Sequence, residues 1–168
     1  MKSATALLAT AWMSCATGAH ADEASFLRTL QGNFAGEGTA RIRTSSPVMN
    51  ISCNFTSDTT ENSLSLDGNC RAMLIMTREI RADLKTDGTA YTGTYIGSRS
   101  GPAGLSGSRE GNAINLDIHW AKIINGDRDA ELTVEKIDAD DMRMTVTDMD
   151  PATGRMVVTS RIDLKRTR

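Results

Sequence analysis

The chain is poor in aromatic residues and in histidine. Tryptophan, tyrosine and phenylalanine make up 4% of its 168 residues, and only two histidines are present. His20 lies in a leader that we expect to be removed, so His119 would be the single imidazole left for acid–base chemistry near neutral pH. No Gly-x-Ser-x-Gly turn is present to supply a serine nucleophile. We therefore expect no catalytic residues and no enzyme.

Metal ligands are also scarce. One histidine and two cysteines cannot complete a three-ligand zinc site by themselves. The acidic stretch Asp148-Met149-Asp150 lacks the glycine and the closing glutamate of an EF-hand, and we interpret it as a turn. We expect no metal site.

Long apolar runs are missing beyond the first residues. No stretch approaches the ~20 continuous apolar residues of a membrane helix, so we expect no membrane span. The formal net charge of −2 argues against nucleic acid as a partner.

Residues 1–21 have the features of a signal peptide. Lys2 gives a basic start, a small apolar segment follows, and Ala19-His20-Ala21 predicts cleavage after Ala21. Lipoprotein processing at Cys15 is the less favoured alternative, because Trp12-Met13-Ser14 does not fit a lipobox. We expect residues 22–168 to form a single domain in the periplasm or outside the cell.

The cysteines that remain, Cys53 and Cys70, form an even pair in a compartment that permits disulfides. A hairpin that turns at 61–62 places Cys53 opposite Cys70 and Phe55 opposite Gly68, which fits both a bridge and one apolar face. We predict a structural disulfide. The apolar face of this hairpin would hold Met49, Ile51, Phe55, Leu64, Leu66, Leu74 and Met76.

The rest of the chain alternates apolar and polar residues in short segments separated by turn residues. The inward positions would be Ile114, Leu116, Ile118 and Trp120, then Met142, Met144 and Val146, then Met156, Val158, Ile162 and Leu164. The same alternation turns His119 outward. The pattern predicts an all-β, antiparallel up-and-down barrel of about eight to ten strands.

A short helix is expected at 23–30, directly before the stretch LQGNFAGEGTARI. Phe26, Leu27 and Leu30 fall on one side of it and can cover one end of a barrel. Glycines at 32, 36 and 38 would let the first strand bend sharply, and Phe34 would fill the floor.

A helix followed by Gly-x-aromatic-x-Gly-x-Gly resembles the start of the calycin proteins, which include lipocalin and nitrobindin-like barrels. In lipocalins an arginine of the last strand packs over the aromatic residue, a place that Arg161 or Arg166 can take here. The nitrobindin-like branch holds haem through a histidine near its C-terminal end, where this chain has VVTSRIDL (157–164). We expect no cofactor.

The expected function is noncovalent binding of a small apolar or amphipathic molecule, since barrels of about eight strands are either filled or hold one small ligand. The glycine-rich run 92–111, with Tyr95, Arg99 and Arg109, is either a loop at the barrel mouth or a gap in the barrel. Six methionines at 49, 73, 76, 142, 144 and 156 suit an adaptable interior, although a core short of aromatic residues would also use them as filler. The predicted ligand-binding residues are Phe34, Tyr95, Arg99, Trp120 and Met144.

The alternative is a protein-binding barrel that resembles the periplasmic inhibitors of secreted metalloproteases. Those proteins share one disulfide and a Gly-x-aromatic opening followed by a cysteine hairpin. In such an inhibitor, residues 22–29 would be mobile and would enter the protease. In a ligand carrier they would be packed against the barrel.

Overall fold

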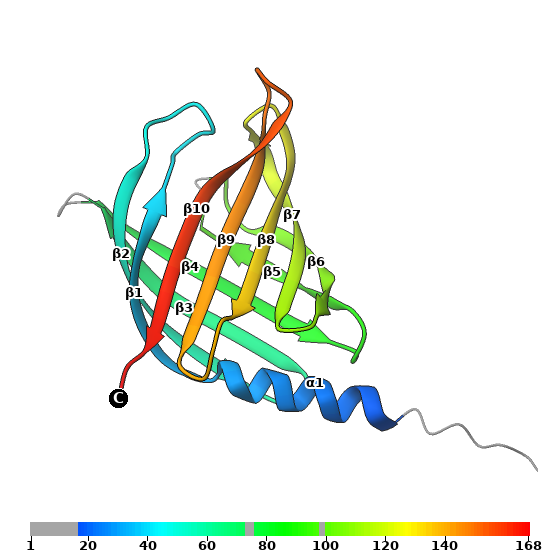
Figure 1. Ribbon diagram of the computed structural model, residues 1–168. Helices are drawn as coiled ribbons and strands as arrows, with labels where there is room; N and C mark the ends of the chain where they lie inside the picture. Colours follow the sequence, from blue (N-terminus) through cyan, green and yellow to red (C-terminus); the bar gives the residue numbers. More distant parts are fainter. Residues whose placement is uncertain (1–16, 73–75, 98–99) are drawn as a thin grey trace, which may run out of the picture.

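The computed structural model describes residues 17–72, 76–97 and 100–168, which form one helix and ten strands (Figure 1). The helix is α1 (Thr17–Leu30). The strands are β1 (Gly32–Ala40), β2 (Met49–Thr59), β3 (Ser63–Ala72), β4 (Met76–Thr86), β5 (Tyr91–Ile96), β6 (Ala103–Glu110), β7 (Ala113–Ile124), β8 (Asp127–Lys136), β9 (Asp141–Asp150) and β10 (Arg155–Arg166).

Each strand pairs antiparallel with the next one in the chain, and β1 pairs with β10 to close the barrel. Every second side chain of a strand points to the same face. The alternation of apolar and polar residues in the sequence therefore places the apolar side chains inside the barrel. In β7, for example, Ile114, Leu116, Ile118 and Trp120 are buried and the residues between them are exposed. The prediction of an all-β up-and-down barrel with an N-terminal helix is confirmed.

The barrel has two different ends. At the helix end, α1 lies beside the start of β1 (Figure 1). At the opposite end, here called the rim end, are the β1–β2 loop (41–48) and the tips of the β7–β8 and β9–β10 hairpins (125–126 and 151–154). The described part of the chain contains no helix with the length and apolar character needed to cross a membrane.

Apolar side chains of α1 close the helix end. Leu27 and Leu30 are fully buried, and Phe34 lies among the same core residues. The Arg166 guanidinium lies 4.7 Å from the centre of the Phe34 ring, and it donates hydrogen bonds to the carbonyls of Thr29 (2.9 Å) and Gln31. The expected packing of a last-strand arginine over Phe34 is therefore present, with Arg166 in that place. The helix begins at Thr17, earlier than the expected residue 23.

Two glycines of β1 allow β10 to approach closely. A Cβ atom at Gly36 would lie 1.9 Å from the carbonyl oxygen of Asp163, and one at Gly38 would lie 2.0 Å from that of Arg161. No side chain fits in either place. The glycines therefore serve the contact between the first and last strands, where the barrel closes.

A buried carboxylate also fixes the helix to the barrel. Glu23 is buried and accepts hydrogen bonds from the Tyr91 hydroxyl and from Arg109 Nε, the latter at 2.9 Å. Arg109 bonds Asp22 as well, and its guanidinium lies 4.7 Å from the centre of the Phe26 ring. Burial beside this carboxylate raises the pKa of Tyr91 far above its ordinary value, so the phenol stays a donor. Arg109 is thus part of the helix end, not of a mouth loop.

The disulfide prediction is confirmed. Cys53 and Cys70 are bonded, with their Cα atoms 4.1 Å apart, and the β2–β3 register also places Phe55 opposite Gly68 as expected. Met76 does not share the apolar face of this hairpin. Strand β3 ends at Ala72, and Met76 begins β4 with an exposed side chain. Met73 and Leu74 lie outside the described residues.

The expected inward positions at the start of β10 are wrong. Met156 and Val158 are exposed, whereas Ile162 and Leu164 are buried as predicted. The register between β10 and β9 shifts between Val158 and Ser160. A β-bulge of this kind reverses the side-chain alternation, so the residues before it point outward.

Candidate functional site

Trp120 lies inside the barrel near the rim end. Only 5% of its surface is exposed, because it continues the inward row of β7. The neighbouring His119 points outward, as predicted, and its Nδ1 lies 2.8 Å from a carboxylate oxygen of Asp129. Arg128 Nε donates to the Trp120 carbonyl at 2.7 Å. The indole Nε1, by contrast, has no hydrogen-bond partner among the residues that the structure describes.

Tyr95 shares this region. Its ring centre lies 5.9 Å from that of Trp120, with the planes tilted by 58°, a favourable geometry for an aromatic pair. The register places Tyr95 between Ala82 of β4 and Ala103 of β6, and these small side chains leave room for the phenol. Burial raises the pKa of Tyr95 to about 12, so its hydroxyl remains protonated at neutral pH.

Asp148 is the buried carboxylate of the rim end, with 2% of its surface exposed. Asn125 Nδ2 donates to its Oδ2 at 2.8 Å, while Oδ1 has no partner within the described ranges. Burial raises the pKa of Asp148 and the nearby Asp127 carboxylate adds to this effect, whereas hydrogen bonding from Asn125 and from the Met149 backbone opposes it. The interpretation of Asp148 as part of a turn is wrong, because it lies within β9 and points inward.

Asp148 and Trp120 lie on neighbouring rows of the interior. Ile118 of β7 faces Ala130 of β8, which in turn faces Asp148 of β9. Trp120 follows Ile118 by two residues on the same face, so it lies one row nearer to the rim. Across the sheet, the small Ala130 side chain lies between Asp148 and Ile118, the inward residue that precedes Trp120.

Several core side chains towards the rim end are slightly more exposed than those at the helix end. Several core side chains near α1 are 0–2% exposed: Leu64, Leu84, Tyr91, Ile114, Val134 and Met142. Six towards the rim end retain 5–9%, whereas Ala103, Ile118 and Asp148 at the same end are 1–2% exposed; the six are Ile51, Ala72, Ile80, Tyr95, Trp120 and Val146. The barrel interior near the rim end is here called the upper interior, and that near α1 the lower interior.

Two further buried atoms lack partners in the described part of the chain, the hydroxyl oxygens of Ser57 and Thr59 near the helix end. Ser57 lies in the densely packed lower interior, where it pairs in register with Gly32. A small rotatable hydroxyl costs less to leave unpaired than a carboxylate does. These two residues therefore do not indicate a binding site.

The predicted ligand-binding residues are only partly brought together. Tyr95 and Trp120 are in contact, but Phe34 lies at the helix end under Arg166. Met144 is buried in the middle of β9, between Val134 and Ile162 in the register. Arg99 lies outside the described residues.

The glycine-rich run does not open the barrel. Strands β5 and β6 pair from Tyr91 and Gly107 to Tyr95 and Ala103, so the interpretation of a gap is wrong. Ile96, where β5 ends, and Ala103, where β6 begins, lie at the rim end. Two expected interior methionines, Met76 and Met156, are exposed, while Met142 and Met144 are buried.

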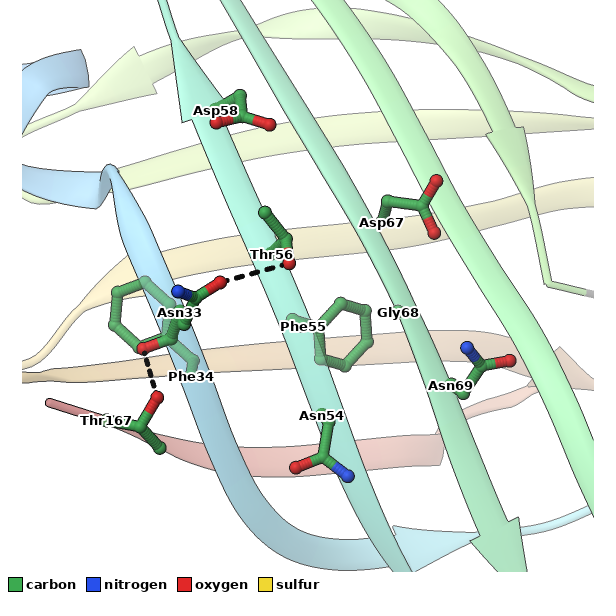
Figure 2. A pocket seen from close by; sticks show the side chains of 10 residues that line it. All are labelled: Asn33, Phe34, Asn54, Phe55, Thr56, Asp58, Asp67, Gly68, Asn69 and Thr167. Atoms are coloured by element: carbon green, nitrogen blue, oxygen red, sulfur yellow. Dashed lines mark hydrogen bonds between the residues drawn. The ribbon is translucent and has the colours of Figure 1, made fainter.

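A polar groove of about 550 Å³ lies on the wall formed by β1, β2 and β3 (Figure 2). Its side chains are mainly amides, carboxylates and hydroxyls, and Thr56 Oγ1 donates to Asn33 Oδ1 at 3.1 Å within it. Phe34 and Phe55 also border it. The groove is widely open to solvent, unlike the enclosed and largely apolar pockets that bind small molecules tightly.

Among the described residues, no group of three or more histidine, cysteine, aspartate or glutamate side chains is placed to hold a metal ion. The site is therefore defined by Tyr95, Trp120 and Asp148 in the upper interior. Sequence reasoning missed Asp148, although the alternation Met142, Met144, Val146 continues onto it.

The fold has a solved counterpart. The crystal structure of Rv2717c from M. tuberculosis matches with a TM-score of 0.67 and 14% sequence identity, covering 86% of this chain and 96% of that one. At that identity the similarity shows a shared barrel fold. Neither protein-family models nor curated proteins give a match to the sequence.

Proposed function

We propose that the protein is an exported calycin-like barrel that binds a small amphipathic molecule noncovalently in the upper interior. The apolar part of the ligand would pack against Trp120, Tyr95 and the aliphatic residues beside them. Its polar group would bond the indole Nε1 or the free carboxylate oxygen of Asp148.

The observation that carries this proposal is the pair of unpartnered polar atoms, Trp120 Nε1 and Asp148 Oδ1. Each belongs to a side chain that is at least nine-tenths buried. A buried polar group without a partner costs about 1–3 kcal/mol, more when it is charged. A bound molecule with a hydroxyl, carbonyl or amine group would remove that cost, which gives the barrel a reason to bind one.

The packing of α1 against the barrel favours a ligand carrier over a protease inhibitor. Residues 22–29 would have to leave the barrel to enter a protease, but Leu27 is fully buried and Glu23 is bonded to Tyr91 and Arg109. Extracting this segment would expose apolar surface and leave the partly buried Arg109 without the Glu23 carboxylate. The Cys53–Cys70 disulfide is compatible with export.

Tryptophan emission tests the proposal, because Trp120 is the one tryptophan of residues 22–168. Decan-1-ol should change the emission saturably. Decane, which has no polar group, should bind more weakly. Asp148→Ala should weaken the binding of decanol about tenfold or more, as expected for one lost hydrogen bond of about 1.5–3 kcal/mol.

The matched control is Asp129→Ala, which removes an exposed carboxylate near the same end and should leave the binding of decanol unchanged. The proposal fails if the emission is already blue-shifted and neither decanol, a fatty acid nor an isoprenoid alcohol alters it. Trp120 would then be part of a solid core.

A further inference from the structure

Exposed large apolar side chains are distributed unevenly over the barrel. Among the described residues, nine such side chains are at least about a third exposed: Ile42, Val48, Met76, Ile96, Ile123, Ile137, Met149, Met156 and Val158. Eight of these lie towards the rim end, and Ile137, in the β8–β9 turn, is the exception. Ile123 is the most exposed, at 71%. Scattered apolar residues on a surface need no explanation, but a gathering at one end does.

Six of them belong to three tips that are bonded to one another. Thr44 of the β1–β2 loop donates from its backbone to Asn125 Oδ1 at 3.2 Å and from its hydroxyl to Asp150 Oδ1 at 3.1 Å. The Arg41 amide donates to the Thr159 carbonyl at 2.7 Å. These bonds join the β7–β8 and β9–β10 tips to the loop. We call residues 41–48, 120–128 and 149–158 the rim platform.

The rim platform is also positively charged. Its five basic residues are Arg41, Arg43, Lys122, Arg128 and Arg155, and its two acidic residues are Asp127 and Asp150. The resulting net charge of +3 contrasts with −2 for the whole chain, so the remaining residues carry −5. The rim platform is thus apolar and basic, whereas the rest of the chain, which includes Asp129 and Asp148 near the same end, is acidic.

We propose that the rim platform docks onto the surface of anionic phospholipid bilayers. Aliphatic side chains that enter the acyl boundary, surrounded by lysine and arginine that face the headgroups, are the features of an interfacial membrane contact. Protein interfaces are enriched in aromatic residues as well as in methionine and arginine, and none of the exposed large apolar side chains in the described part of the platform is aromatic.

Docking goes beyond ligand binding and does not depend on it. If both hold, the upper interior opens towards the bilayer, which is where an amphipathic ligand dissolves. The acidic remainder of the chain would orient the molecule with its helix end away from an anionic surface.

Sedimentation with vesicles tests the docking. The exported chain should bind vesicles of phosphatidylglycerol and phosphatidylcholine, and less so as the salt concentration rises. Ile123→Ser should weaken the partition about tenfold, because the side chain no longer enters the apolar layer. Ile137→Ser is the matched control, since Ile137 is 41% exposed at the opposite end, and it should bind as the wild type does.

A charge-reversal variant measures the electrostatic contribution to vesicle binding. Lys122→Glu should weaken binding to anionic vesicles about 25-fold, since each basic residue near such a surface contributes about fivefold. Lys85→Glu changes an exposed lysine near the helix end and should have a far smaller effect. Both variants should bind pure phosphatidylcholine vesicles equally.

Three results would overturn the proposal. The first is a wild-type protein that does not sediment with anionic vesicles. The second is equal weakening by Ile123→Ser and Ile137→Ser when both variants melt as the wild type does. The third is a wild-type dimer that Ile123→Ser dissociates without any vesicle binding, which would make the platform a self-association surface.

Discussion

The two ends of the barrel are built from different kinds of contact. At the helix end, Leu27, Leu30 and Phe34 are buried, and Glu23, Arg109 and Arg166 are bonded to partners. At the rim end, by contrast, Trp120 Nε1 and Asp148 Oδ1 lack partners in the described part of the chain, and apolar side chains face outward.

This difference separates stability from function. Groups that are packed and bonded lower the free energy of the fold and have little left with which to bind another molecule. Groups that remain unpaired or exposed reduce stability, and proteins commonly retain such groups at functional sites. We therefore expect substitutions at the helix end to change stability, and substitutions at the rim end to change binding.

The largest expected effect is the loss of a helix-end side chain. Leu27→Ala should lower the free energy of unfolding by about 2–5 kcal/mol, because it removes a fully buried side chain and leaves a cavity. Ile123→Ala, at the rim end, should change it by less than about 0.5 kcal/mol. Urea unfolding measures both values, and similar losses in the two variants would contradict the contrast.

The next largest effect is expected from the disulfide, which joins β2 and β3. Replacing Cys53 and Cys70 by serine should lower the free energy of unfolding by about 3 kcal/mol, given the sequence separation of 17 residues. Binding of decanol to the folded protein should not change. A variant that melts like the wild type would show that the bridge does not constrain the barrel.

Substitution of Glu23, the carboxylate that bonds α1 to the barrel, should have a smaller effect on the free energy of unfolding. Glu23→Gln keeps the shape of the side chain but weakens its bonds to Arg109 and Tyr91, and should cost about 2 kcal/mol. Glu110→Gln changes an exposed glutamate near the same end and serves as the control. Thermal unfolding of the two variants gives the comparison, and equal melting temperatures would argue against the buried pair.

Substitution of Asp148 should have the smallest effect on stability, and this effect should depend on pH. Its raised pKa means that the folded state prefers the protonated carboxyl, so its contribution to stability is present below pH 3.8 and is lost as the pH rises through the raised value. Asp148→Asn should remove this loss and leave the variant as stable as the wild type, or more stable by up to about 1 kcal/mol, at pH 7.

The contribution of Asp150 to stability should change with pH in the opposite direction. Bonds from the hydroxyls of Thr153 and Thr44 lower its pKa, so its contribution is present at neutral pH and is lost as the pH falls below 3.8. Melting curves between pH 3 and pH 7 should therefore move in opposite directions for Asp148→Asn and Asp150→Asn relative to the wild type. Parallel curves would show that Asp148 is not held in a desolvated place.

Sequence reasoning reached the fold because its signals are local and repeated. The alternation in β7 fixes which residues point inward, and the spacing of Cys53 and Cys70 around a short turn fixes the register of β2 and β3. The glycines around Phe34 were expected to let the first strand bend, whereas the structure shows that Gly36 and Gly38 allow the close approach of β10.

The site was less accessible to sequence reasoning, because it depends on contacts between distant strands. A bulge between Val158 and Ser160 turns Met156 outward, and no residue type in that segment predicts the bulge. Arg109 belongs to the glycine-rich run 92–111 that suggested a barrel mouth, but it bonds Glu23 at the helix end. Asp148 was overlooked because acidic residues near a proline suggest a turn.

Native mass spectrometry of the protein, recovered from the cells that produce it, shows whether the upper interior holds a ligand. Ligand binding in the upper interior predicts a bound species of a few hundred daltons, in the range of single-chain amphiphiles, that dissociates on activation. This species should be depleted in Asp148→Ala but retained in Asp129→Ala. A protein that carries no small molecule, even after incubation with an envelope lipid extract, would contradict it.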